Sequence, residues 1–186
     1  MSSLIVGEGG LSRPSWAAQD PLMRDYYDTE WGMPIRDEQG LFERISLEAF
    51  QSGLSWATIL RKRDNFRAAF SQFDPELVAK FTDADIERLM EDAGIVRNKR
   101  KILATINNAK ATLQLREKGG LVEFVWGFKP DETPQPETLE EIPTQSPESV
   151  ALSKALKKEG FSFVGPTTMF ALMEAIGIVD THLVGS

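Results

Sequence analysis

The chain has 186 residues, of which 41% are hydrophobic and 26% are charged, a composition typical of one soluble globular domain. It has no cysteine and one histidine, His182, which excludes disulfides, thiolate metal sites and histidine-rich metal sites. The formal net charge of −7 argues against a general nucleic-acid coat protein, which would usually be basic.

Residues 1–12 are predicted to form a loose N-terminal tail. They lack the charged leader and hydrophobic region of a secretion signal. No apolar run in the chain approaches the roughly 20 residues that span a bilayer. We therefore expect a cytoplasmic protein with no membrane partner.

Aromatic residues are concentrated early in the chain. Three of the four tryptophans and both tyrosines are Trp16, Tyr26, Tyr27, Trp31 and Trp56. Their flat faces and polar handles suit a planar ligand, and each stacked base contributes about 1–3 kcal/mol. Packing in the core explains the same residues, and by count alone it is the favoured interpretation.

The segment 39–52 has the periodicity of a helix, and its apolar stripe runs through Leu41 and Ile45 to the position of Glu48. Glu48 is therefore predicted to point inward, where an unpartnered carboxylate is costly. A planar cationic ligand with hydrogen-bond donors would offset that cost. An arginine of the chain would do so as well, and for a lone glutamate this is the commoner outcome.

Helical patterns dominate the rest of the chain. Further helices are predicted over 56–70, 75–80, 83–92, 98–118, 121–128, 148–159 and 167–176. A connection at about 129–148 is predicted to be exposed and extended, since residues 131–148 hold six acids, no base and four prolines. Two segments, 61–67 and 97–101, are strongly cationic, so an acidic protein can still present a basic face.

The stretch LMEDAGIVRNKRKILATINNAKA, residues 89–111, resembles a helix-hairpin-helix, which we place at about 86–113. The backbone of the Gly94 turn and the following helix start can hold a DNA phosphate. The cationic side chains there are Arg97, Lys99, Arg100 and Lys101. A plain helical hairpin with a solvated basic turn explains the spacing equally well, and Val96 stands where the motif usually has a second glycine.

Seven collinear motifs together resemble the DNA-3-methyladenine glycosylase I family over nearly the whole chain. They are QDPL (19–22), YYDTEWG (26–32), LFERISLEAFQSGLSWATIL (41–60), FDPELVA (73–79), DAGIVRNKRKI (92–102), ALSKALKKEGFSFVGPTT (151–168) and GIVDTHLVG (177–185). Only the first dozen residues fall outside this resemblance. It implies an all-α, helix-hairpin-helix DNA glycosylase fold, with two helical lobes around a base-binding cleft in one domain, residues 13–186.

The same resemblance implies a base-excision repair enzyme that flips 3-methyladenine out of double-stranded alkylated DNA and hydrolyses its bond to the sugar. The products would be the free base and an abasic site, without a lyase step. We expect a monomer, because the DNA-binding face must stay open.

The family also implies roles for individual residues. Glu48 would be the catalytic residue and would accept hydrogen bonds from the exocyclic amino edge of the base. Tyr26 and Trp56 would stack on that base, while Trp16 and Trp31 would close the pocket. In the DNA-binding segment that begins at Gly53, Leu54 would act as a wedge in the gap left in the duplex, although an ordinary hydrophobic residue at a helix end explains Leu54 as well.

The chain departs from the family at a zinc site that joins the two termini in many relatives. The matching positions are Pro14, Tyr27, His182 and Ser186. Only His182 is a usual zinc ligand, so we expect no metal and no cofactor, with the termini held by packing. Met23 also occupies a position where an aromatic residue often lies near the pocket.

The sequence is also compatible with two other functions. A binding module for abasic sites or unusual DNA structures could keep the fold and lose hydrolysis, although such a module would not need an adenine-shaped pocket. A glycosylase for a different damaged base is the other alternative.

Overall fold

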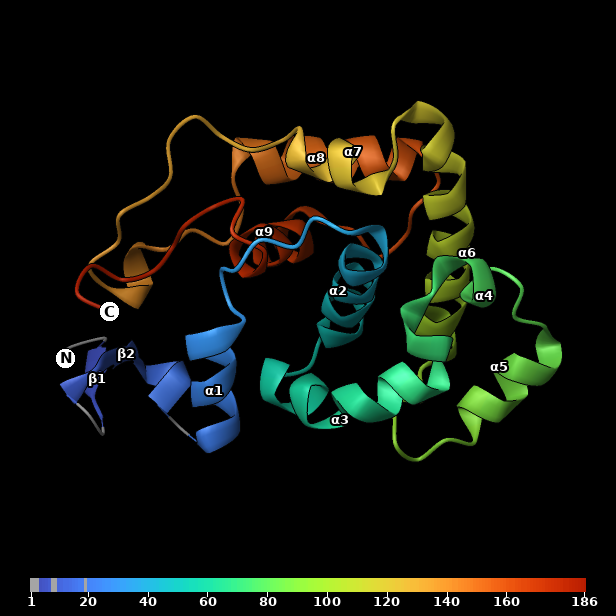
Figure 1. Cartoon of the computed structure of the whole chain (residues 1–186), viewed down its shortest axis with the longest axis horizontal. Helices are drawn as coiled ribbons and strands as arrows, with labels where there is room; N and C mark the ends of the chain where they lie inside the picture. Colours follow the sequence, from blue (N-terminus) through green and yellow to red (C-terminus); the bar gives the residue numbers. More distant parts are fainter. Residues whose placement is uncertain (1–3, 8–9, 19) are drawn as a thin grey trace.

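The structure is a computed structural model that describes residues 4–7, 10–18 and 20–186. Helices make up most of this part of the chain, and its sheet has two short strands (Figure 1). The predicted all-α fold class is therefore confirmed. None of the described helices is long and apolar enough to cross a membrane.

The predicted helices form close to their expected positions. The α-helices are α1 Pro21–Thr29, α2 Glu38–Gln51, α3 Trp56–Ala69, α4 Pro75–Val78, α5 Asp83–Met90, α6 Lys99–Leu115, α7 Leu121–Trp126, α8 Pro147–Lys158 and α9 Pro166–Ala175. Short 3-10 helices are η2 Ser15–Ala18, η3 Ser71–Phe73, η4 Arg116–Lys118 and η5 Leu139–Glu141. Side-chain N-caps begin several α-helices: Asp37 accepts from Gly40 N, Ser55 from Thr58 N, and Asn98 from Lys101 N.

Helix α1 was not predicted from the sequence, although its start is well specified. Asp20 caps it by accepting a hydrogen bond from Met23 N at 2.9 Å, and Pro21 occupies the first turn. The helix has only nine residues, and the sequence predicts its aromatic residues as a cluster rather than as a helical face.

The segment expected to be a loose tail contains a strand. β1 (Leu4–Val6) pairs antiparallel with β2 (Ser12–Pro14). The buried Arg13 of β2 donates two hydrogen bonds to Asp28 on α1, at 2.9 and 2.7 Å. This bidentate pair attaches the two strands to α1. Sequence periodicity could not indicate such a contact.

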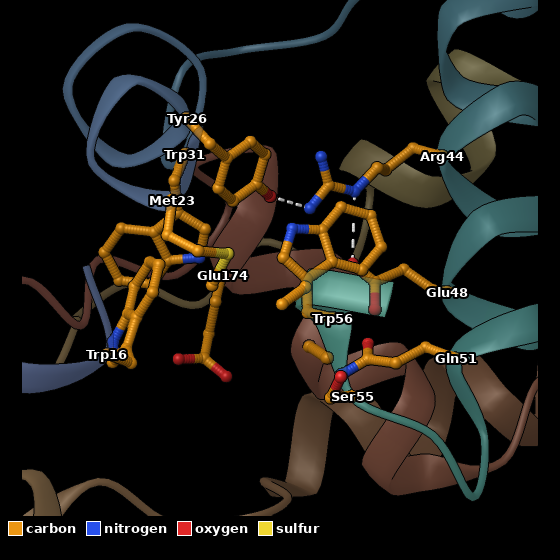
Figure 2. A pocket seen from close by; sticks show the side chains of 12 residues that line it. Trp16, Met23, Tyr26, Trp31, Arg44, Glu48, Gln51, Ser55, Trp56 and Glu174 are labelled. Atoms are coloured by element: carbon orange, nitrogen blue, oxygen red, sulfur yellow. Dashed lines mark hydrogen bonds and ion pairs between the residues drawn. The ribbon is translucent and has the colours of Figure 1, made fainter. Parts of the chain in front are cut away.

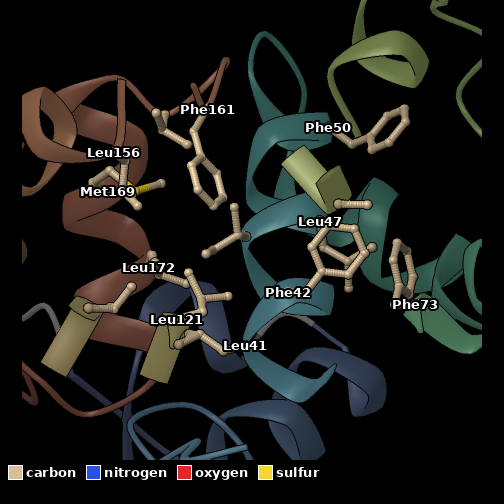
Figure 3. Packing of buried hydrophobic residues seen from close by; sticks show 14 of the residues in the cluster. Leu41, Phe42, Leu47, Phe50, Phe73, Leu121, Leu156, Phe161, Met169 and Leu172 are labelled. Carbon is tan, nitrogen blue, oxygen red and sulfur yellow. The ribbon is translucent and has the colours of Figure 1, made fainter. Parts of the chain in front are cut away.

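Helix α2 lies at the centre of the molecule, in contact with α3, α6, α7 and α9 (Figure 1). The main hydrophobic core surrounds it (Figure 3), and buried phenylalanines such as Phe50 and Phe66 pack with ring centroids 4.7 Å apart. A second, smaller cluster of buried residues, Met23, Tyr26 and Leu60, joins α1 to α3. The pocket described below lies where the two clusters meet.

Helices α5 and α6 and the turn between them form the predicted helical hairpin. In the turn, Gly94 N donates to Asp92 Oδ1 at 2.8 Å. A Cβ atom at Gly94 would lie 3.0 Å from the side-chain amide of Asn65, a distance that real Cβ atoms seldom show. Glycine therefore allows the turn to pack closely against α3.

The acidic connection between α7 and α8 is largely irregular, as predicted, with η5 as its one helical turn in the described structure. It is not isolated from the rest of the chain, because Val184 N donates to Pro136 O at 2.8 Å. This hydrogen bond joins the connection to the C-terminal segment.

Candidate functional site

A pocket with a volume of about 330 Å³ opens between α1, α2, α3 and α9 (Figure 2). It is lined by Trp16, Met23, Tyr26, Trp31, Arg44, Glu48, Gln51, Ser55, Trp56, Ala57, Ala171 and Glu174. All five residues predicted to bind a base are among them. The pocket has the apolar, aromatic lining and few polar groups that are typical of a site for a small planar ligand.

Glu48 points inward, as the periodicity of α2 predicts, and its relative exposure is only 4%. Arg44, one helical turn earlier, places its Nε 3.1 Å from Glu48 Oε1. The other carboxylate oxygen, Oε2, is buried and has no hydrogen-bond partner among the described residues. Such a group indicates a missing polar partner. Glu48 can thus pair with Arg44 through Oε1 and still accept a hydrogen bond from a ligand through Oε2. The two partners considered from the sequence, an arginine and a ligand, are therefore compatible with each other.

The electrostatics of Glu48 follow from its burial. Desolvation raises the pKa of the Glu48 carboxyl, and the Arg44 guanidinium opposes this rise. Since arginine keeps its proton at any ordinary pH, Arg44 stabilises the ionised form of Glu48.

Arg44 also connects Glu48 to the aromatic wall. Its guanidinium carbon lies 4.2 Å from the ring centroid of Trp56, and its Nη2 donates to the Tyr26 hydroxyl. The rings of Tyr26 and Trp56 lie 5.5 Å apart and are tilted by 45°. The indole Nε1 of Trp56 is a buried donor without a partner in the described part of the chain. Glu48 Oε2 and Trp56 Nε1 are therefore a buried acceptor and a buried donor that the described residues leave unpaired at the pocket.

Trp16 and Trp31 form the opposite side of the pocket. Their ring centroids lie 5.4 Å apart in an edge-to-face arrangement. The ring centroids of Trp31 and His182 lie 4.7 Å apart. The C-terminal segment that contains His182 therefore supports this side of the pocket. These rings are compatible with both core packing and ligand stacking, because each packs on its neighbours and lines the pocket.

Sequence reasoning missed two charged residues of the pocket, Arg44 and Glu174. Arg44 could have been found from its spacing of four residues before Glu48. Glu174 is the only charged residue in α9, PTTMFALMEA, and that isolation was an unused signal. Burial raises the pKa of Glu174 to about 7, the negative charge of Glu48 adds to the rise, and a hydrogen bond from Thr181 opposes it.

With one exception, the residues predicted to contact DNA are exposed or half-buried, on two turns and at the start of α6. Gly53 has a φ of +81°, a backbone conformation that favours glycine, and it turns the chain between α2 and α3. Leu54 beside it is a large apolar side chain with 42% exposure. On the hairpin, Arg97, Lys99 and Arg100 are exposed, and no described carboxylate forms an ion pair with them.

Lys101 is the exception, and the structure corrects its predicted role as a surface phosphate contact. Its side chain is buried, with 7% exposure, and its ammonium donates to the carbonyl oxygens of Phe50 and Ser52. Because these carbonyls end α2, Lys101 caps that helix from the start of α6. The ammonium group of Lys101 therefore holds the turn at Gly53 in place and does not face solvent.

The other cationic segment, 61–67, is also largely neutralised within the fold. Its arginines Arg61, Arg63 and Arg67 pair with Asp20, Glu30 and Glu43, respectively. These pairs attach α3 to α1 and α2. Of the two cationic segments, 97–101 therefore keeps more unpaired charge in the described structure.

The four positions that match the family's zinc site are brought together in part. The Tyr27 hydroxyl donates to Ser186 Oγ at 2.9 Å, and the rings of Tyr27 and His182 lie 5.5 Å apart. The donor set does not fit zinc, because it contains one imidazole, a phenol, an alcohol and a proline. No group of three or more acidic or histidine side chains in the described residues has the arrangement of a metal site.

Comparison with known proteins agrees with this geometry. Residues 16–186 match the methyladenine glycosylase family. This chain belongs to the methyladenine glycosylase family. The family match covers every pocket residue, including both carboxylates.

Individual methyladenine glycosylases are similar along most of their length. DNA-3-methyladenine glycosylase 1 of Escherichia coli is 52% identical over 179 residues, which are 94% of this chain and 95% of that protein. A crystal structure of 3-methyladenine DNA glycosylase I has a TM-score of 0.89 at 47% identity, covering 93% of this chain and 97% of that one. The Staphylococcus aureus enzyme, studied for the structural basis of its 3-methyladenine recognition, has a TM-score of 0.84 at 38% identity, covering 89% of each chain.

Proposed function

We propose that this methyladenine glycosylase removes 3-methyladenine from alkylated double-stranded DNA and leaves an abasic site. The observation that carries the proposal is the pocket, in which the buried Glu48 Oε2 and Trp56 Nε1 both lack partners in the described structure. An adenine edge offers both kinds of partner, since its amino group donates and its ring nitrogens accept.

The chemistry requires little from the protein beyond binding. Methylation at ring nitrogen 3 gives the adenine a positive charge while it is attached to the sugar, so it leaves without being protonated. Water attacks the sugar carbon, the bond from that carbon to the base breaks, and the base departs neutral. The attacking water loses one proton, which balances the charge.

The chain's own residues bind and orient the base in this reaction. Glu48 Oε2 accepts a hydrogen bond from the exocyclic amino group, while Arg44 holds Oε1 in place. Tyr26 and Trp56 stack on the flipped base, which offsets the few kcal/mol that flipping costs. No lysine lines the pocket in the described structure, in keeping with a hydrolytic reaction without a lyase step.

DNA is held outside the pocket by two exposed turns. Backbone N–H groups near Gly94 and the charges of Arg97, Lys99 and Arg100 contact phosphates, and this binding is sensitive to salt. Leu54 fills the gap left by the flipped nucleotide. We infer that the protein acts as a cytoplasmic monomer and needs no zinc or other cofactor.

The test is release of free base from N-methylated genomic DNA, resolved by chromatography, with Glu48→Gln measured in parallel. Wild type should release 3-methyladenine, and the variant should be slower by about 10- to 100-fold, the usual loss of a hydrogen bond to a charged group. Glu43→Gln on the same helix, outside the pocket, is the matched control. Binding of abasic duplex without release of any base would favour a non-catalytic binding module, and release of another base would reveal a different lesion.

A further inference from the structure

A second carboxyl faces the pocket from α9. Glu174 Oε2 accepts a hydrogen bond from Thr181 Oγ1 at 2.6 Å, and no hydrogen bond joins Oε1 to the described residues. Figure 2 shows this carboxyl in the space between Trp16 and Ser55. Thr181 therefore fixes one oxygen and leaves the other available to a ligand.

The charges already present in the pocket leave a bound cation in need of a second carboxylate. The positive charge of Arg44 already balances the negative charge of Glu48, 3.1 Å away. A cationic base that binds beside Glu48 thus enters a site with no net charge from that pair. Burial of an uncompensated cation is unfavourable, so cation binding needs another anion.

We propose that Glu174 is that anion: it balances the positive charge of the flipped methylated base and makes the pocket select cationic over neutral bases. This inference rests on the proposed function and adds a specificity-determining residue to it. Glu48 then recognises the hydrogen-bonding edge of the base, and Glu174 recognises its charge.

The surroundings of Glu174 suit a carboxyl that ionises only when a cation arrives. Its pKa of about 7 reflects burial first, the opposing hydrogen bond from Thr181 second and repulsion by Glu48 third. Among the described residues nearby, Arg44 pairs with Glu48, and Asp180 Oδ1 lies 2.7 Å from His182 Nδ1. Near pH 7 the empty pocket holds a mixture of neutral and ionised Glu174, and a cation selects the ionised form. Cation binding should therefore release protons and tighten as the pH rises to 7 and above.

The test compares two ligands by quenching of tryptophan fluorescence between pH 6 and pH 8. The first is 3,9-dimethyladeninium, a fixed cation in which the 9-methyl group stands in for the sugar carbon. The second is neutral 3-methyladenine at pH 8. For wild type, the cation should bind about tenfold more tightly at pH 8 than at pH 6.

Glu174→Gln keeps an oxygen that accepts from Thr181 but cannot ionise. Its affinity for the cation should fall about tenfold at pH 8 and lose its pH dependence, while its affinity for 3-methyladenine stays unchanged. Asp180→Asn removes a nearby negative charge outside the pocket and should behave as wild type. Should the Gln variant fold poorly, calorimetry of wild type in buffers of different ionisation enthalpy still measures the proton released on cation binding.

The inference is overturned if Glu174→Gln binds the cation as wild type does, if it weakens both ligands equally, or if wild type releases no proton. These outcomes are independent of the proposed activity. Base release by wild type from methylated DNA tests that activity separately, so a failure of either one can be recognised.

Discussion

Arg44 Nε and Glu48 Oε1 lie 3.1 Å apart on adjacent turns of α2, and their pairing leaves Glu48 Oε2 buried without a partner in the described chain. The ion pair therefore compensates the buried charge of Glu48 and leaves one carboxylate oxygen for a ligand. Catalytic sites commonly combine burial and charge in this way.

Replacement of Arg44 by methionine should strongly destabilise the protein. The change leaves Glu48 as an unpaired buried charge, and breaking such pairs typically costs about 3–5 kcal/mol. The loss should be measured as the free energy of unfolding in urea.

The pH dependence of this variant follows from the direction of the Glu48 pKa. Without Arg44, burial alone raises the pKa of the folded carboxyl above its unfolded value, so the folded state binds the proton more tightly. The contribution of Glu48 to the stability of this variant should be greatest at low pH and should fall as the pH rises from the unfolded pKa through the folded one. Adding Glu48→Gln to Arg44→Met should remove most of this dependence, and its persistence in the double variant would contradict the assignment.

Leu54→Ala should weaken binding of abasic duplex and leave binding of free 3-methyladenine intact. The side chain is exposed on the turn between α2 and α3 and lies outside the pocket, so its loss removes a contact with the duplex only. Fluorescence titrations with both ligands check this, and equal weakening of both would disprove the wedge.

Arg97→Ala and Lys101→Met should have different effects. Arg97 is exposed, so its loss should reduce the salt dependence of DNA binding by about one counterion, with melting unchanged. Lys101 caps the end of α2 from within the fold, so its loss should lower the melting temperature and leave the salt slope as in wild type. Equal salt slopes for wild type and Arg97→Ala would remove Arg97 from the DNA-binding face.

Metal analysis of the purified protein should find no stoichiometric zinc, and treatment with a chelator should leave its melting temperature unchanged. The hydrogen bond from Tyr27 to Ser186 should instead contribute to stability. Tyr27→Phe should cost about 1 kcal/mol in the free energy of unfolding. Tightly bound zinc in a 1:1 ratio would contradict this account.

Local patterns in the sequence predicted much of this architecture. The periodicity of apolar residues placed the helices from α2 to α9 and turned Glu48 inward, because a helical face is set by residues three and four apart. The motifs of the family identified the aromatic residues that line the pocket. Helix α1 and the pairing of β1 with β2 that precedes it were not predicted, since these elements are short and depend on contacts such as Arg13 with Asp28.

Only the tertiary structure decided how the charges are used. The sequence placed Lys101 among the exposed cations, whereas packing of α6 against the end of α2 buries it. Glu174 reaches the same pocket as Glu48 because α9 packs on α2, across more than a hundred residues of chain. Local periodicity shows which side of a helix faces inward, but the partner of a buried charge depends on which other helix packs there.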